Sequence, residues 1–157
     1  MEFLGNSMES SHIPYPTLAS FRKTGQLDIH KLKFICKEVV SAIMYIHGKG
    51  ILHNDIKGDN VIVAGDRIVL IDFGKATTIK CAVQYNITPG SEEQSTYNTY
   101  HRHFAHELWN IPLTRQSVMT DTYSIGYMFN HTACSIPYEP SIQLGRQMEA
   151  ATLSLLD

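Results

Sequence analysis

The sequence feature that most constrains the fold of this chain is a polar octet followed by two short apolar runs. The octet spans His53–Asn60 (HNDIKGDN), and the apolar runs Val61–Val63 and Ile68–Ile71 come after it. A Gly-Asp pair between the runs suits a tight turn, so the runs are predicted to pair as a β-hairpin. Because a hairpin reverses the chain, Asn60 at the start of one strand comes close to Asp72 at the end of the other.

The hairpin would gather three polar groups with complementary chemistry. The carboxylate of Asp55 can accept a proton from a hydroxyl group. Asn60 and Asp72 supply oxygen atoms, which are the ligands that Mg²⁺ prefers. Asp and Asn also favour turns, so none of the three is informative when taken alone. Their spacing predicts a Mg²⁺ site at Asn60 and Asp72, beside a proton-accepting carboxylate.

An amphipathic pattern in front of the octet predicts a long scaffold helix over residues 28–48. Asp28 is a suitable N-cap, and the basic residues and glycines at 47–50 suit a C-terminal end. Burying the apolar face would contribute on the order of 10 kcal/mol before conformational entropy is subtracted. The apolar residues of that face recur in steps of three and four, and they are Ile29, Leu32, Ile35, Val39, Ala42, Ile43 and Ile46.

The remaining segments give weaker signals. A short helix is expected at Leu18–Lys23, and a strand at Gly50–His53. Residues 75–104 show no periodicity and are interpreted as a long surface segment, which at this length is usually functional or mobile. Apolar residues then return at Ala105, Leu108 and Trp109, which are expected in the core. Further helices are predicted from near Asp121 through Phe129, and over residues 141–156.

Composition narrows the class of function. The chain has 157 residues, of which 43% are hydrophobic and 18% charged, and this fits one domain with a packed core. A net charge of −2 is too balanced to suggest nucleic-acid binding, and no apolar run approaches the ~20 residues that span a bilayer. Cys36, Cys81 and Cys134 form no disulfide framework, so the cytosol or nucleus is the expected location.

Four motifs in a fixed order resemble the eukaryotic-type protein kinase family. The octet stands where that family has its catalytic loop, and Asp72-Phe73-Gly74 stands at its Asp-Phe-Gly motif. The segment 105–107 (AHE) resembles the Ala-Pro-Glu motif that closes the activation segment. The segment 121–126 (DTYSIG) resembles the helix under the catalytic loop, where Asp121 would cap backbone N–H groups near His53.

The resemblance implies a role for each site residue. Asp55 would accept or orient the proton of the substrate hydroxyl, and Lys57 would neutralise the transferred phosphate, in the manner of Ser/Thr kinases. Asn60 and Asp72 would bind Mg²⁺. The implied ATP site comprises the backbone C=O of Glu2 and N–H of Leu4, which would bind adenine, together with Lys57, Asn60, Ile62 and Asp72.

The implied fold class is α+β: a kinase-like C-terminal lobe, mainly helical, with a short β-hairpin at the catalytic loop. Residues 1–157 would form one partial kinase-like domain. Within the 157 residues there is no Gly-x-Gly-x-x-Gly loop and no Val-Ala-Ile-Lys strand, so this large lobe is expected to be inactive on its own. Its parts would be a hinge-like segment 1–6, the scaffold helix 28–48, the catalytic loop 53–60, the activation segment 72–107 and the lower helices 121–157.

Several residues depart from the family pattern or allow a plainer interpretation. Asn54 replaces an Arg that in many kinases grips a phosphorylated activation loop, so a switch of that type is not expected. The H-x-H-x-x-H cluster of His101, His103 and His106 is interpreted as an irregular lead into the motif at 105–107 rather than as a metal site. His53 is expected to be a packing residue. Glu107 is expected to be solvent-facing or locally paired.

The expected function is transfer of the γ-phosphate of ATP, with Mg²⁺, to hydroxyl groups of a protein substrate. Two alternatives stay open. One is a non-catalytic, pseudokinase-like module that binds a partner protein on the face left by the missing small lobe. The other is a small-molecule phosphotransferase of the kinase-like fold, which the residue Asn54 favours, because some of those enzymes have a His-Asn-Asp loop.

Overall fold

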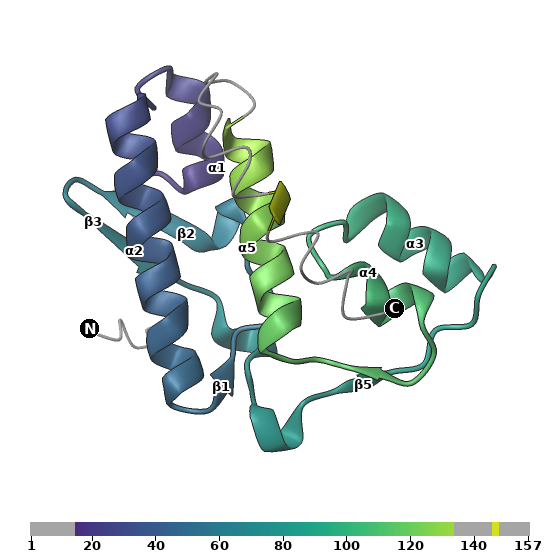
Figure 1. Ribbon diagram of the computed structural model, residues 1–157. Helices are drawn as coiled ribbons and strands as arrows, with labels where there is room; N and C mark the ends of the chain where they lie inside the picture. Colours follow the sequence, from purple (N-terminus) through teal and green to yellow (C-terminus); the bar gives the residue numbers. More distant parts are fainter. Residues whose placement is uncertain (1–14, 134–145, 148–157) are drawn as a thin grey trace, which may run out of the picture.

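The computed structural model describes residues 15–133 and 146–147, and within them the architecture is α+β and mainly helical, as predicted (Figure 1). Glu2, Leu4, the hinge-like segment 1–6 and most of the helix expected at 141–156 lie outside the described residues. The helices are α1 (Leu18–Phe21), α2 (Ile29–Gly48), α3 (Glu92–Tyr100), α4 (His106–Asn110) and α5 (Val118–Ala133). The strands are β1 (Ile51–Leu52), β2 (Val61–Ala64), β3 (Arg67–Leu70), β4 (Thr77–Thr78), β5 (Gln84–Tyr85) and β6 (Thr114–Arg115).

Helix α2 confirms the predicted scaffold. The Asp28 side chain caps it by accepting a hydrogen bond from the backbone N–H of Lys31 at 2.8 Å. Its buried side chains follow the predicted stripe, while Ile29 and Ala42 at the edge of that stripe are only partly buried. The fully buried members are Leu32, Ile35, Val39, Ile43 and Ile46. The short helix expected before it is also present, as α1 followed by a 3₁₀ turn at Arg22–Thr24.

The predicted hairpin is formed by β2 and β3 as an antiparallel pair, in which Val61 lies opposite Leu70. Gly65, in the turn, has a φ of 61°, which a glycine adopts without strain. The backbone N–H of Ile71 donates to the carbonyl oxygen of Asn60 at 3.0 Å, so the pairing extends one step beyond the strands. Asn60 therefore lies across from the residue that precedes Asp72, as the hairpin requires.

Two further strand pairs connect the segment after the hairpin to the rest of the fold. Strand β1, which enters the catalytic loop, pairs with β4, and β5 pairs with β6. Strand β1 corresponds to the strand expected at Gly50–His53, whereas β4, β5 and β6 were not predicted from the sequence. Strands of two residues carry no alternating pattern that a sequence could display.

Residues 75–104, predicted to be a long surface segment, contain a helix that the sequence analysis did not predict, α3. Ser91 caps this helix, with its side chain accepting from the backbone N–H of Gln94 at 3.1 Å, and two acidic residues occupy the first turn. No residue of α3 is buried, so the helix has no apolar stripe to reveal it. The available signal was Ser91 followed three residues later by Gln94, which is the pattern of a capping box.

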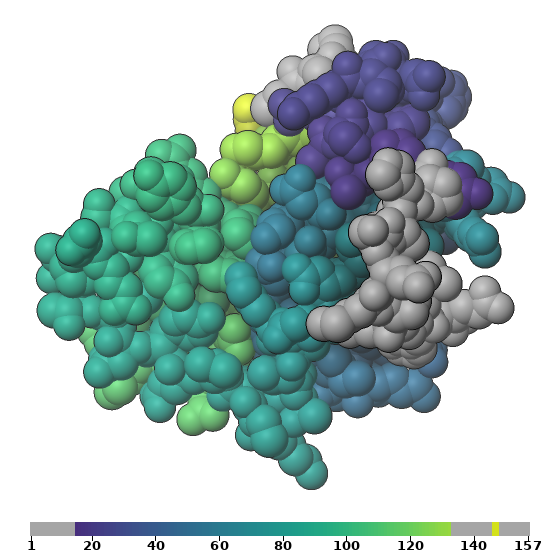
Figure 2. Space-filling view, turned by 180° about the vertical axis from the view of Figure 1, so that it is seen from behind, coloured from purple at the N-terminus to yellow at the C-terminus, as the bar shows by residue number. Residues whose placement is uncertain are grey.

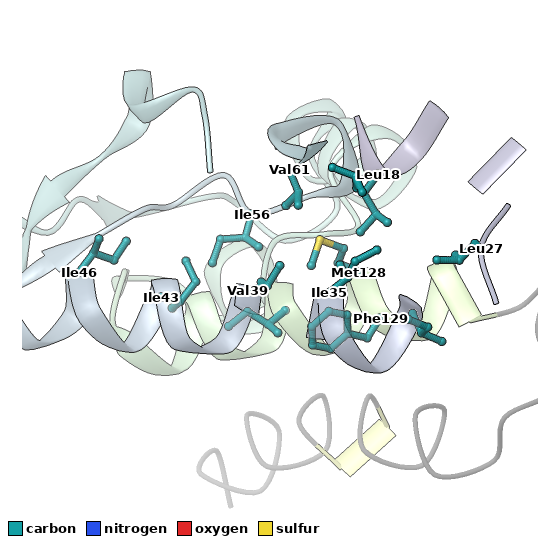
Figure 3. Packing of buried hydrophobic residues seen from close by; sticks show 13 residues of the cluster. Leu18, Leu27, Ile35, Val39, Ile43, Ile46, Ile56, Val61, Met128 and Phe129 are labelled. Atoms are coloured by element: carbon teal, nitrogen blue, oxygen red, sulfur yellow. The ribbon is translucent and has the colours of Figure 1, made fainter. Parts of the chain in front are cut away.

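The apolar side chains form two clusters, and α5 contributes to both, through Met128 and Phe129 to the larger and through Tyr123 to the smaller. In the larger cluster, Ile35 and Val39 of α2 point toward Met128 and Phe129 of α5 (Figure 3). The smaller cluster lies under α3 and contains Trp109, as expected, with the other members Ile87, Phe104, Ala105, Leu108 and Tyr123. In the described part of the chain, no helix combines the length and apolarity needed to cross a membrane.

Candidate functional site

The catalytic loop is held from below by one buried carboxylate, as predicted for Asp121. Its two oxygens accept from the backbone N–H groups of His53 and Asn54, each at 2.9 Å. The Nε2 of His47, near the end of α2, lies 2.9 Å from the same carboxylate. Asn54 has a φ of 63°, a conformation that costs energy in a non-glycine residue. The contacts to Asp121 therefore fix a strained backbone next to Asp55.

His53 is a packing residue, as expected. Its side chain is fully buried and lies against the ring of Phe73 at a centroid distance of 4.8 Å. Its Nε2 lies 3.2 Å from the carbonyl oxygen of Ile71, on the hairpin. Burial lowers the pKa of His53 below its ordinary value, although nearby carboxylates, including Asp72, act to raise it. A neutral imidazole thus fills the space between the loop and the hairpin.

Asp55 is buried, and four donors engage its carboxylate. The Nζ of Lys57 lies 3.0 Å from Oδ2, and the Nδ2 of Asn60 lies 3.2 Å from the same oxygen. The Nζ of Lys75 and the Nε2 of His103 lie 3.3 Å and 2.9 Å from Oδ1. Each carboxylate oxygen has two lone pairs, so these four donors use the full acceptor capacity of the group.

The charge of Asp55 is stabilised by these contacts. Burial acts to raise the pKa of its carboxyl, but hydrogen bonds from His103 and Lys57 and the positive charges of Lys75 and Lys57 outweigh that effect. The pKa of Asp55 is held well below its usual range as a result. The pKa of His103 is lowered, mainly by burial. The contact requires an N–H on Nε2, because a carboxylate oxygen only accepts.

Asn60 and Asp72 lie at the two ends of the hairpin. Besides its contact with the Asp55 carboxylate, the Nδ2 of Asn60 donates to the backbone oxygen of Asp55 at 2.8 Å. Its amide nitrogen is therefore committed to Asp55, which leaves the amide oxygen as the atom that could bind a cation. Asp72 is exposed, has a φ of 60°, and accepts from the backbone N–H of Gly74 at 3.3 Å. Two oxygen donors of this kind suit Mg²⁺.

The other residues proposed for the ATP site are Ile62, Lys57, Glu2 and Leu4. Ile62 is buried in β2, where it pairs with Val69 and forms a bridge to Thr17. Lys57 is partly buried and directed to Asp55. Glu2 and Leu4 lie outside the described residues.

Lys75 and His103 contact Asp55 and were not among the site residues predicted from the sequence. Lys75 directly follows Asp72-Phe73-Gly74, and its ammonium group also lies over the ring of Phe104 at 4.9 Å.

His103 belongs to the histidine cluster, whose members contact three different groups. His101 stacks on Phe104 at 5.5 Å, and the Nε2 of His106 lies 2.9 Å from the hydroxyl of Tyr123. The part of the chain that the structure describes contains no group of three or more His, Cys, Asp or Glu side chains that could hold a metal ion.

Of the two alternatives expected for Glu107, solvent-facing or locally paired, the solvent-facing one was wrong. Helix α4 packs into the smaller cluster and takes this side chain with it, leaving it 5% exposed. Burial raises the pKa of its carboxyl, and a hydrogen bond with its own backbone opposes the change. Its Oε2 has no hydrogen-bond partner among the described residues. The motif at 105–107 therefore anchors the end of the activation segment in the core.

Asn54 links the catalytic loop to the activation segment. Its Nδ2 donates to the backbone oxygen of Lys75 and to Oγ1 of Thr77, both at 3.0 Å. That the protein is not switched by a phosphate docking beside Asp55 stays a prediction.

Comparison with known proteins agrees with the motifs. Residues 8–152 match the protein kinase domain family. Serine/threonine-protein kinase pim-2 of Danio rerio is 33% identical, over 73% of this chain and 34% of the relative. Sperm motility kinase 3A of Mus musculus is 38% identical, over 45% of this chain and 14% of the relative. 3-phosphoinositide-dependent protein kinase 1 of Homo sapiens is 41% identical, over 40% of this chain and 11% of the relative.

The chain thus spans at most 34% of the length of these relatives. The matched region nevertheless covers most of the 157 residues. Together with the order of the motifs and the α+β fold, this match shows that the chain belongs to the protein kinase domain family.

Proposed function

We propose that the chain forms the catalytic large lobe of a serine/threonine protein kinase, which transfers the γ-phosphate of ATP to protein hydroxyl groups. The observation that carries the proposal is the engagement of Asp55 by Lys57 and Asn60 from the same loop, next to the hairpin that leads to Asp72. The relatives named as kinases support the same reaction class.

In the proposed reaction, Asp55 holds the acceptor hydroxyl and takes up its proton. Its low pKa keeps the carboxylate ionised, and therefore able to accept, at neutral pH. Lys57 lies beside Asp55 and places a positive charge where the transferred phosphate would pass. Asn60 and Asp72 would hold Mg²⁺, which when bound neutralises charge on the phosphate oxygens.

Because every acceptor position on Asp55 is engaged, an incoming hydroxyl must replace one of the four donors. Lys57 and Asn60 come from the catalytic loop itself. Lys75 and His103 belong to the activation segment, and the Lys75 contact is the longest of the four at 3.3 Å. We therefore assign the Oδ1 side, facing Lys75 and His103, as the side from which the hydroxyl enters.

These 157 residues by themselves are proposed to bind ATP weakly and to lack useful turnover. A glycine-rich loop and a strand Lys, which clamp the phosphates in this family, are not among them. Removing a single preorganised donor from an active site typically lowers the rate by about 10²–10³-fold. The test of the site is therefore binding rather than catalysis.

Calorimetric titration of the 157-residue chain with ATP tests this proposal. Weak, saturable binding is expected with Mg²⁺ and not without it, and Asp72→Ala should weaken it by about tenfold or more. Asp66→Ala is the matched control, because Asp66 is an exposed carboxylate in the turn at the opposite end of the hairpin. Equal affinity in Asp72→Ala and wild type would contradict the proposed metal site.

The substrate class needs a separate assay. A radiolabel-transfer panel would compare protein substrates with aminoglycosides, choline and sugars. Transfer to a small molecule, abolished by Asp55→Ala, would favour the small-molecule phosphotransferases. Robust transfer to protein by these 157 residues alone, lost in Asp72→Ala, would show that the expected inactivity is wrong.

A further inference from the structure

A groove of about 480 Å³ opens beside the candidate site. It lies where α1 and the following 3₁₀ turn, the catalytic loop, the end of α3 and the later turns of α5 meet. Figure 2 shows the surface hollowed there, between the purple N-terminal helices and the teal segment that contains α3. Lys57 and His103 line this groove, and both also contact the Asp55 carboxylate. An occupant of the groove would therefore lie next to the group proposed to hold the acceptor hydroxyl.

The floor of the groove is closely packed. A side chain added at Gly58 would place its Cβ 3.3 Å from the backbone nitrogen of Ala19, which is tighter than ordinary contact. The catalytic loop thus sits directly on α1, and a larger residue at position 58 would require a small shift of the α1 backbone. On the other side, the ring of Tyr127 stacks on His131 at 4.0 Å. These contacts give the groove a defined shape before anything binds.

The charge of the groove is mainly positive. Its described lining includes the cations Arg22, Lys23 and Lys57, and Asp59 is the acidic residue among them. Arg22 donates through Nη1 to the backbone oxygen of His131 at 2.5 Å, which holds the guanidinium at the rim. The Lys57 side chain is paired with Asp55, whereas the Lys23 side chain makes no ion pair or hydrogen bond with any other described residue. Lys23 is therefore the cation best able to bind a new anion.

Three histidines add further polar groups to the same lining: His101, His103 and His131. Burial lowers the pKa of His101 and of His103, so both are neutral at physiological pH. A neutral imidazole has one N–H, and His103 already directs its N–H to Asp55, so His101 is the one of these two that can donate to an occupant. The lining thus combines fixed positive charge at one rim with a neutral donor at His101.

We propose that this groove binds the substrate peptide through acidic side chains, aspartate or glutamate, that flank the phosphoacceptor residue. The inference rests on the proposed kinase function, because it takes the occupant to be the phosphoacceptor peptide. Positive charge favours carboxylates and repels lysine and arginine, so the same groove selects against basic peptides. The partner is therefore a protein segment with acidic residues next to a serine or threonine.

Peptide binding to the full 157-residue chain, measured without ATP by fluorescence anisotropy, tests the inference. Three fluorescein-labelled peptides share one central serine and differ only in the flanking residues, which are aspartate, alanine or lysine. The aspartate peptide should bind about five- to tenfold more tightly than the alanine peptide, and this advantage should shrink in high salt. Equal binding of the three peptides, or preference for lysine, would overturn the inference.

Lys23→Glu supplies the variant and Lys37→Glu the matched control. Both replace an exposed lysine with the same change in charge, but Lys37 lies on α2, away from the groove. Only Lys23→Glu should remove the preference for aspartate, and Lys23→Gln should reduce it by a smaller factor. A preference that survives Lys23→Glu, or that is lost equally in Lys37→Glu, would show that the groove does not recognise the acidic peptide.

Two further ligands, a phosphoserine peptide and an oligonucleotide, distinguish acidic-peptide binding from binding of other anions. A phosphoserine in place of one aspartate should retain or strengthen binding through Lys23, because it carries more negative charge. A single-stranded oligonucleotide that binds more tightly than every peptide would identify the surface as a nucleic-acid site and overturn the inference. Acidic-peptide preference with failed ATP binding would contradict the proposed function alone, and ATP binding without that preference would contradict the groove alone.

Discussion

At the level of single residues, the donors around Asp55 decide how its carboxylate behaves. Burial on its own would favour the protonated form, yet His103, Lys57 and Lys75 reverse that tendency. In an unfolded chain an aspartate titrates near pH 3.9, at about its ordinary pKa. Because the folded-state pKa lies below that value, the ionised group stabilises the fold above about pH 4. That stabilisation is lost as the pH falls toward the folded-state pKa.

Replacing His103 with alanine is expected to raise the pKa of Asp55 toward its ordinary value. The variant loses the 2.9 Å hydrogen bond to Oδ1, while Lys57 and Lys75 keep the pKa below that of a free aspartate. The loss of stability on acidification should then begin at a higher pH than in the wild type. An NMR titration of the carboxyl carbon, with unfolding measured across the same pH range, checks both expectations.

His101→Ala is the control for this titration. His101 belongs to the same segment, and its ring stacks on Phe104 instead of bonding to Asp55. It should leave the pKa of Asp55 close to the wild-type value. If His103→Ala also left that pKa unchanged, the imidazole would not be a lasting partner of the carboxylate in solution.

At the level of elements, α3 depends on its cap more than on the core. None of its residues is buried, and its Gln94 side chain accepts from the backbone N–H of Gly90 at 2.7 Å. Helices of this length are marginal without tertiary support. The hydrogen bonds at Ser91 and Gln94 are therefore a large share of what keeps the segment helical.

Ser91→Ala is expected to cost about 1 kcal/mol of local helix stability and to speed amide exchange throughout α3. Global stability should change little, because the apolar clusters stay intact. Hydrogen exchange followed residue by residue measures the effect. Ser95→Ala, at an exposed position inside the same helix, should not speed exchange, since alanine is a better helix former than serine. Equal protection of α3 in Ser91→Ala and wild type would count against the cap.

The contrast between α2 and α3 explains how much of the fold the sequence could reveal. Helix α2 buries one face, so its apolar spacing was visible, and Asp28 marked its start. The hairpin was visible through its turn and its two apolar runs. Helix α3 and the two-residue strands β4, β5 and β6 bury too little to leave a pattern.

The residues of the candidate site likewise fall into those that the sequence could predict and those that it could not. Asp55, Lys57, Asn60 and Asp72 lie within twenty residues of one another, and local spacing was enough to group them. His103 is 48 residues away from Asp55, and only the folded activation segment brings the two together. Glu107 was misjudged for a related reason: its burial depends on how α4 packs, which a five-residue helix does not encode.

At the level of the whole molecule, α2 and α5 together support the larger cluster. Ile35 is fully buried and lies between these helices (Figure 3). Ile35→Ala is expected to cost about 2–5 kcal/mol, because it removes buried methyl groups and leaves a cavity that the neighbours fill only in part. Urea unfolding measures this as a lower midpoint with an unchanged slope.

Met44→Ala provides the comparison within α2. Met44 is 68% exposed, so its truncation should change the free energy of unfolding by less than about 0.5 kcal/mol. Similar losses in both variants would mean that α2 does not pack through the face that carries Ile35.

The carboxylate of Asp121 has a consequence for how this protein could evolve. It receives hydrogen bonds from the catalytic loop at His53 and Asn54, contacts His47 of α2, and itself belongs to α5. A substitution of Asp121 would therefore alter the catalytic loop and weaken the contact between α2 and α5 at the same time. Drift that erodes the chemistry at this position also erodes folding, so lineages that no longer needed catalysis would still be under pressure to keep the aspartate.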